Sequence, residues 1–221
     1  MERIAILGGT FDPVHWGHLM IAATALSQLE LERVIWVPVR RPPHKHGRRY
    51  EHRRLMVEIA IAQNSAFVLD PRKTNHTEPD YAIDTLADLQ DAYPNRQWFW
   101  IVGLDAFQTL PRWYCRERLV PACDWLVAPR PLAMTSPHAV VSTSTSHPQE
   151  IKPQASWLCQ QVAEQLSAQD ILIRWQMLHM PPMSISSSLI RQSCSQGHSL
   201  RDCVPEGVRA YITTHNLYVE N

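Results

Sequence analysis

The stretch Arg3–His18, RIAILGGTFDPVHWGH, decides the fold of this chain. Its apolar run Arg3–Leu7 predicts a strand, and Gly8-Gly9 predicts a tight turn, since glycine lacks a Cβ and tolerates unusual backbone angles. His15 and His18 stand just under one helical turn apart, at the start of a helical pattern. The junction therefore predicts backbone N–H groups and two imidazoles at one strand tip, an arrangement suited to a polyphosphate.

Strands alternate with helical patterns along the whole chain, which is typical of a parallel sheet covered on both faces. We therefore predict one α/β domain over residues 1–221. It is a Rossmann-like, doubly wound parallel sheet with helices on both faces and a small C-terminal helical part, Ser187–Gln196 and Glu206–His215. Strands are expected at Arg3–Leu7, Val34–Val37, Phe67–Leu69, Trp98–Val102, Trp125–Ala128 and Ile171–Leu178.

Two stretches interrupt this alternation. Val39–Tyr50 is basic and rich in proline, which predicts a loop. Pro131–Pro153 is rich in Ser, Thr and Pro, which predicts a flexible surface excursion at about 131–153. The arginines in and after the first loop are expected on a solvated surface: Arg48, Arg49, Arg53 and Arg54.

The composition excludes several classes of protein. Lys plus Arg and Asp plus Glu each number 21, so the formal net charge is zero, which argues against a nucleic-acid partner. No apolar stretch approaches the roughly 20 residues of a membrane span, and no leader pattern precedes the first strand. The five cysteines are scattered, which predicts reduced thiols and a cytoplasmic location.

Four of the six predicted strand tips, the first included, carry groups suited to one part of a nucleotide. Lys45 follows the second strand, Gly103 and Asp105 follow the fourth, and the SISSSLIR stretch Ser184–Arg191 follows the last. Lysine and arginine bind phosphate, and a carboxylate accepts hydrogen bonds from ribose hydroxyls. The serine hydroxyls are either helix N-caps or phosphate donors. Trp113, in a polar context with proline, is suited to stack on a flat ligand.

Two other kinds of site compete with this interpretation. His15, His18, His44 and His46 offer a histidine cage for zinc, but no cysteine lies near them and the nearby carboxylate, Asp12, stands inside the turn. We therefore predict no protein-bound metal. A dinucleotide-dependent oxidoreductase needs a G-x-G-x-x-G turn and an acidic second strand tip. This chain has neither.

With the strand tips assembled, the chain resembles the nucleotidyltransferases marked by a His-x-Gly-His signature, and among them the bacterial nicotinate-nucleotide adenylyltransferases. The signature specifies only the superfamily, and the later motifs narrow it. The matching stretches run from end to end: GGTFDPVHWGHL (8–19), PPHK (42–45), DYAIDTL (80–86), VGLDAF (102–107), RWY (112–114), SISSSLIR (184–191) and VPEGVRAYITTHNLY (204–218).

The resemblance implies that ATP donates an adenylyl group to nicotinate mononucleotide, giving deamido-NAD and pyrophosphate, with Mg²⁺ carried on ATP. It implies catalytic roles for His15, His18 and Arg191. ATP would be bound by Gly8, Gly9, Thr10, Phe11, Gly103, Asp105, Ser186 and Ser188. The mononucleotide would be bound by Lys45, Tyr81, Ala82, Ile83, Trp113 and Tyr114.

The chain departs from the family pattern at Asp80-Tyr81-Ala82, where members often have Ser-Tyr-Thr, and at Ser188, where threonine is usual. Loss of a hydroxyl at Ala82 weakens the expected preference for nicotinate over nicotinamide mononucleotide. Nicotinamide mononucleotide or another phosphorylated acceptor therefore stays an alternative, as does a nucleotide-binding or metal-binding module without transferase activity. The oligomeric state, a homo-oligomer included, stays open.

Overall fold

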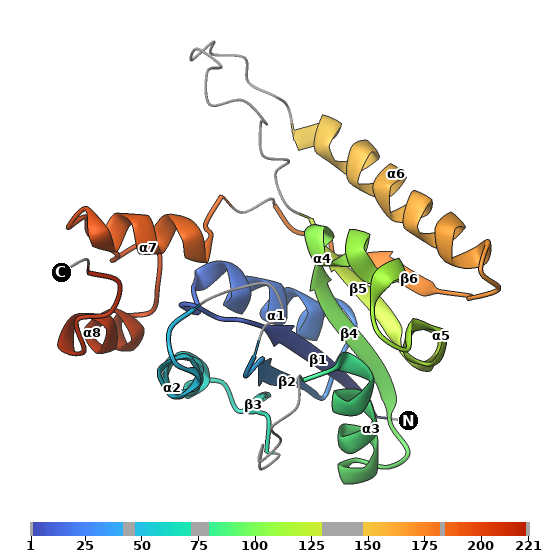
Figure 1. Ribbon diagram of the computed structural model, residues 1–221, viewed down its shortest axis with the longest axis horizontal. Helices are drawn as coiled ribbons and strands as arrows, with labels where there is room; N and C mark the ends of the chain where they lie inside the picture. Colours follow the sequence, from blue (N-terminus) through green and yellow to red (C-terminus); the bar gives the residue numbers. More distant parts are fainter. Residues whose placement is uncertain (1, 42–46, 72–79, 130–147, 182–183, 220–221) are drawn as a thin grey trace.

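The computed structural model describes residues 2–41, 47–71, 80–129, 148–181 and 184–219, with only the backbone described for 148–153. Lys45 and most of the predicted excursion at 131–153 lie outside these ranges. Figure 1 shows a central sheet with helices on both sides.

The described strands form one six-stranded sheet in the order β3-β2-β1-β4-β5-β6, and every neighbouring pair is parallel. This order runs outward in both directions from β1 and β4, as doubly wound sheets do. The strands are β1 (Arg3–Gly9), β2 (Arg33–Pro38), β3 (Phe67–Leu69), β4 (Gln97–Gly103), β5 (Asp124–Ala128) and β6 (Arg174–Met177).

Alternate residues of β1 enter separate cores on the two faces of the sheet, since successive side chains of a strand point to opposite sides. Ala5 and Leu7 pack with α1 (Trp16–Gln28), α2 (Tyr50–Ile61), α7 (Ser187–Ser195) and α8 (Glu206–Thr214). Ile4 and Ile6 pack with α3 (Ala82–Ala92), α4 (Leu104–Thr109), α5 (Arg116–Leu119) and α6 (Pro148–Ser167). The predicted fold class is confirmed.

The differences from the predicted elements lie at their ends. β1 and β4 extend to Gly9 and Gly103, because the glycines continue the ladder with their neighbours. β6 is shorter than the predicted Ile171–Leu178, and α6 begins at Pro148, inside the stretch that the composition predicts as an excursion. Pro148 is the first residue of α6, a position at which proline is tolerated, so the proline content of this stretch does not show where the loop ends and the helix begins.

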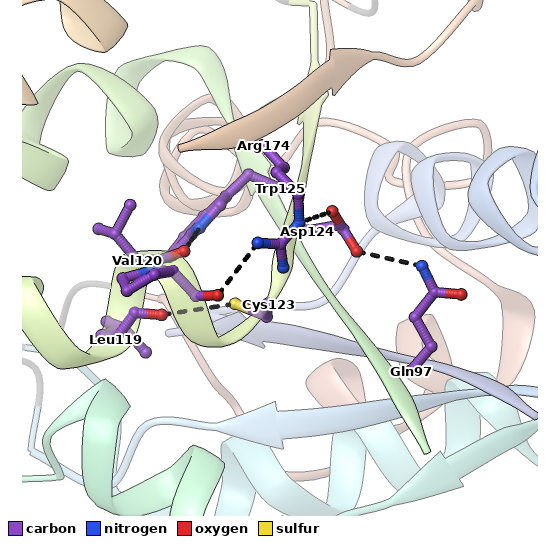
Figure 2. A network of polar contacts seen from close by, with 8 residues as sticks. Gln97, Leu119, Val120, Cys123, Asp124, Trp125 and Arg174 are labelled. Carbon is purple, nitrogen blue, oxygen red and sulfur yellow. Dashed lines mark hydrogen bonds and ion pairs between the residues drawn. The ribbon is translucent and has the colours of Figure 1, made fainter. Parts of the chain in front are cut away.

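Polar contacts fasten the sheet at the amino ends of its last three strands (Figure 2). The Asp124 carboxylate accepts hydrogen bonds from Arg174 Nε at 2.6 Å and Gln97 Nε2 at 3.2 Å, joining β5 to both neighbours. Trp125 Nε1 donates to the Val120 carbonyl at 3.1 Å. These residues lie at the opposite end of the strands from the predicted ligand site, so they hold the edge strand and leave the carboxyl ends for chemistry.

Helices long and apolar enough to cross a bilayer do not occur in the part of the chain that the structure describes.

Candidate active site at the carboxyl ends of the strands

The strand tips that the sequence singles out do lie along one edge of the sheet. Gly8 and Gly9 of β1 pair with Val37 and Pro38 of β2, and Gly103 of β4 pairs with Ala128 of β5. Parallel strands place their carboxyl ends at a common edge, and open α/β sheets bind ligands there, at the point where the strand order reverses. In this sheet that point lies between β1 and β4.

His15 and His18 form a stacked pair at the start of α1, with ring centroids 3.7 Å apart. His15 is the N-cap residue and is buried, with 6% of its surface exposed. Its backbone N–H donates to His18 Nδ1 at 3.3 Å. A neutral His18 whose Nδ1 accepts a hydrogen bond carries its proton on Nε2. The contact therefore selects the tautomer that presents an N–H donor on the far side of the ring.

Gly17 makes room for the His15 ring, and Gly9 makes room for Phe11, which packs against His18. A Cβ on Gly17 would lie 3.0 Å from the His15 ring, and a Cβ on Gly9 would lie 2.9 Å from Cζ of Phe11. Phe11 is buried and packs edge-on against His18, with centroids 5.0 Å apart. The Phe11 side chain therefore supports the His18 ring from behind, in addition to the backbone role that the resemblance implies.

The serine and arginine motif at the start of α7 packs against the loop after β1. Ser187 Oγ donates to the Pro13 carbonyl at 2.9 Å, and Arg191 Nη1 donates to the Asp12 carbonyl at 2.8 Å. Ser188 Oγ accepts from Arg191 Nη2 at 3.3 Å. The structure thus brings two segments about 170 residues apart in sequence into one cluster. Arg191 joins them, because its guanidinium contacts both the loop after β1 and the start of α7.

Ser186 has the helix-capping role that the sequence offered as one of two choices. Its Oγ accepts a hydrogen bond from the Leu189 N–H at 3.3 Å, and its backbone is extended, as N-cap residues are. The cap fixes where α7 begins and hence where Ser188 and Arg191 stand on it.

A second group, the aromatic group, consists of Tyr81, Trp113 and Tyr114. The Tyr81 and Tyr114 rings are 4.4 Å apart between centroids and are 39% and 58% exposed. Trp113 donates from Nε1 to Thr109 Oγ1 at 2.9 Å and meets the ring of Trp100 edge-on. Trp100 Cζ2 lies 3.8 Å from where a Cβ on Gly8 would be, so the Trp100 side chain lies between Trp113 and the glycine turn.

Four further predicted residues lie where their motifs place them. Gly103 is the N-cap of α4, and the exposed Asp105 lies in the first turn of that helix. Ala82 is the first residue of α3, directly after Tyr81, and Ile83 is buried. Acidic residues also stabilise the start of a helix through its dipole, so Asp105 has a structural role whether or not it binds ribose.

Arg53 contradicts the expectation of a solvated surface. Only 2% of its surface is exposed, and its guanidinium donates to the carbonyls of Thr10, Arg40 and Arg48. Burial lowers the pKa of Arg53, and the nearby Asp12 opposes that shift. The sequence did hold a signal, because Arg53 shares helical spacing with the buried Met56 and Val57.

Asp12 is a second functional candidate that sequence reasoning missed. It is buried, and its Oδ1 accepts a hydrogen bond from the hydroxyl of Tyr218 at 2.6 Å, across nearly the whole chain. Burial and this carboxylate together raise the pKa of Tyr218 above its ordinary range. Nothing in the local sequence predicts the contact, because it joins the first loop to the last residues described.

The part of the chain that the structure describes contains no group of three or more His, Cys, Asp or Glu side chains placed to hold a metal ion. His44 and His46, which the alternative zinc site requires, lie outside the described residues, as does Lys45.

Comparison with known proteins finds relatives that match this chain over its full length. The family model described as cytidylyltransferase-like matches residues 6–193. A probable nicotinate-nucleotide adenylyltransferase of Trichormus variabilis is 47% identical over 221 residues, covering 100% of this chain and 99% of that protein. One of the same description from Nostoc is 46% identical with the same coverage.

Solved structures support the fold. A Plasmodium falciparum nicotinic acid mononucleotide adenylyltransferase complexed with NaAD superposes with a TM-score of 0.71 at 21% identity, covering 99% of this chain and 98% of that one. The same enzyme complexed with APC gives 0.70 at 20% identity, with the same coverage.

Proposed function

We propose that this chain, which belongs to the cytidylyltransferase-like family and within it to the nicotinate-nucleotide adenylyltransferases, transfers the adenylyl group of ATP to nicotinate mononucleotide. The products are deamido-NAD and pyrophosphate. The reaction is a step of NAD biosynthesis.

One observation of the site carries the proposal. The starts of two helices, α1 with the His15–His18 pair and α7 with Ser188 and Arg191, meet around the loop after β1. Helix N-termini, imidazole N–H groups and a guanidinium are donors that bind phosphate oxygens. Several of them converge on one loop, which is the arrangement that a triphosphate requires.

The chemistry needs positioning more than it needs acid or base. An oxygen of the mononucleotide phosphate forms a bond to the α-phosphorus of ATP while the bond from that phosphorus to the bridging oxygen of pyrophosphate breaks. The second pKa of a phosphate monoester is about 6, so the nucleophile is already ionised at neutral pH. The site therefore acts by holding the two groups in line and stabilising the charge that develops on the phosphates.

The proposed roles follow from position. His18, with its proton on Nε2, donates to the phosphates next to the reacting phosphorus, and His15 orients it. Arg191 and Ser188 bind the phosphates that leave as pyrophosphate, with Ser186 fixing the start of their helix. The proposed adenosine site comprises Gly8, Gly9, Thr10, Phe11, Gly103 and Asp105, and the proposed mononucleotide site comprises Lys45, Tyr81, Ala82, Ile83, Trp113 and Tyr114.

The described residues fit a Mg²⁺ ion that arrives on ATP better than one held by the protein. Asp12 is the carboxylate nearest to the histidine pair in sequence, and both its oxygens already accept hydrogen bonds, from Tyr218 and from the backbone of Arg48. Mg²⁺ bound to the phosphates neutralises part of their charge, while the protein's nitrogen donors orient the oxygens that remain.

We propose that the start of α3 determines whether nicotinate or nicotinamide mononucleotide is the preferred acceptor. Ala82 offers no hydroxyl to a carboxylate, but it opens a helix whose first N–H groups lack partners within the helix. Such groups bind carboxylates. This supports nicotinate mononucleotide as the preferred acceptor, with a smaller margin than a threonine at this position would give.

The proposed compartment is the cytoplasm. All five cysteines are unpaired, and burial raises the pKa of Cys159 to about 11, which keeps it a thiol. Unpaired thiols are typical of reducing compartments.

The test is a direct assay of the purified protein with Mg-ATP and each mononucleotide in turn, measuring pyrophosphate release and the dinucleotide formed. We expect deamido-NAD with nicotinate mononucleotide and a lower kcat/KM with nicotinamide mononucleotide. A higher kcat/KM with nicotinamide mononucleotide contradicts the proposed acceptor. Absence of any dinucleotide, with ATP still bound, supports the non-catalytic module instead.

A further inference from the structure

Arg53 joins three separate segments of backbone at one buried point. From α2, its Nη1 donates to the Thr10 carbonyl at 2.6 Å, Nε to the Arg48 carbonyl at 2.9 Å, and Nη2 to the Arg40 carbonyl at 3.1 Å. Thr10 belongs to the loop after β1, and Arg40 follows β2. All three nitrogens of one planar group are therefore used, each on a different segment.

The two ends of the loop after β2 are held through both of their backbone groups. The Arg40 N–H donates to Asp80 Oδ2 at 2.6 Å while its carbonyl binds Arg53. The Arg48 N–H donates to Asp12 Oδ2 at 3.2 Å while its carbonyl also binds Arg53. Gly47 has no room for a side chain here, because a Cβ would lie 2.7 Å from Asp12 Oδ2.

These contacts form one continuous connection between the two proposed substrate sites. Thr10, on the ATP side, binds Arg53, which binds Arg40, whose N–H binds Asp80. Asp80 directly precedes Tyr81, on the mononucleotide side. The guanidinium is rigid and planar, so it fixes the spacing between the carbonyls that it binds.

Stability alone is a poor reason for an arginine at this position. A buried cation loses its hydration, and replacing such a group by an apolar one of similar size is often neutral or stabilising. Met56 and Val57 on the same face of α2 are apolar and fully buried. The distinctive property of Arg53 is the fork of donors, which an apolar side chain lacks.

We infer that Arg53 is a positioning residue for adenylyl transfer, which sets the distance between the loop that binds ATP and the segment that binds the mononucleotide. The inference rests on the proposed function. Arg53 touches neither substrate and acts through Thr10, Arg40 and Asp80. Because it aligns two bound substrates relative to each other, its loss lowers kcat more than it raises either KM.

The first test is Arg53→Lys, which keeps the positive charge and loses the planar fork. We expect kcat to fall at least about tenfold with each KM changed less than about threefold. Arg54→Lys is the matched control, since Arg54 is the next residue, its side chain is 41% exposed, and it pairs with Glu58 on the same helix. Its kcat is expected to stay within about twofold of the wild type. A folded R53K protein with the kcat of the wild type overturns the inference.

Chemical rescue separates positioning from general support of the fold. In Arg53→Ala, added guanidinium is expected to restore part of kcat, and ammonium at the same ionic strength is not. Equal effects of the two cations contradict the inference. If the Arg53 variants do not fold, Asp80→Ala removes the acceptor of the Arg40 N–H and so breaks the same connection. An unchanged kcat in Asp80→Ala overturns the inference. Wild-type protein that makes no dinucleotide contradicts the proposed function itself, and removes the basis of this inference with it.

Discussion

The two ends of the candidate site are built differently. At the phosphate end, His15 and Phe11 are buried, and the backbone of Thr10, Asp12 and Pro13 is held by side chains from α2 and α7. At the proposed acceptor end, Tyr81 and Tyr114 are more than a third exposed, and their rings pack against each other.

The difference fits the role that we propose for each end. In-line transfer depends on fixed donors, and displacements of about 1 Å are costly. Recognition of a flat ring depends on aromatic area, which tolerates adjustment. Changes at the phosphate end are therefore expected to lower kcat, and changes at the acceptor end are expected to raise the KM of the mononucleotide.

The largest effect is expected from His18→Ala at the phosphate end. Loss of the donor nearest the reacting phosphorus is expected to lower kcat by about 10²–10³-fold. Circular dichroism and thermal unfolding check that the fold is intact. His198→Ala, at an exposed position after α7, is the control and is expected to keep full activity. Near-normal turnover in folded His18→Ala protein would falsify the assignment of His18.

Gly9→Ala tests whether the packing behind His18 matters for turnover. The new methyl group would lie 2.9 Å from Phe11 Cζ, so Phe11 must move and the His18 ring loses its support. We expect kcat to fall by about tenfold, since small displacements of a catalytic donor are costly. We also expect the free energy of unfolding to fall by about 1–3 kcal/mol, since an added methyl group overpacks the site. Gly8→Ala makes ordinary contact with Trp100 at 3.8 Å and should cost less. Steady-state kinetics give kcat for both variants. A larger loss of kcat in Gly8→Ala than in Gly9→Ala would contradict the proposed role of the packing behind His18.

Trp113→Ala tests the acceptor end. Removal of a stacking ring is expected to cost about 1–3 kcal/mol of binding, which is about a 5-fold to 150-fold rise in the KM of the mononucleotide. The KM of ATP should change less than about twofold, and Trp113→Phe should recover most of the affinity. Initial rates with one substrate varied at a time give both values. Equal rises in both KM values would remove the distinction between the two ends.

The smallest effect is expected from Ala82→Thr. A hydroxyl at the start of α3 adds one hydrogen bond to the nicotinate carboxylate, worth about 0.5–1.5 kcal/mol, which raises the preference for nicotinate over nicotinamide mononucleotide by about 2-fold to 12-fold. The ratio of kcat/KM for the two acceptors measures it. An unchanged or lower ratio would mean that the start of α3 does not contact the carboxylate.

Strand positions were predictable because their apolar runs and breaks are local. Phe67–Leu69 matches β3 residue for residue, and the other strands, the longer predicted β6 included, overlap their predictions. The start of α6 was not predictable, because its first residues share the composition of the preceding loop. The positions of His15, His18 and Arg191 around the loop after β1 were predictable, since each lies in a short motif beside a strand tip or a helix start. Their roles toward phosphate stay predictions.

The sequence by itself determined the doubly wound sheet, the edge of the sheet at which we propose that ligands bind, and the residue types gathered there. These depend on periodicity and on turn residues, which act over a few positions. Only the tertiary structure decided that Arg53 is buried beneath the loop after β1 and that Tyr218 binds Asp12. Those contacts join segments 43 and 206 residues apart, and the pairing of such distant polar groups depends on how the helices pack on the sheet.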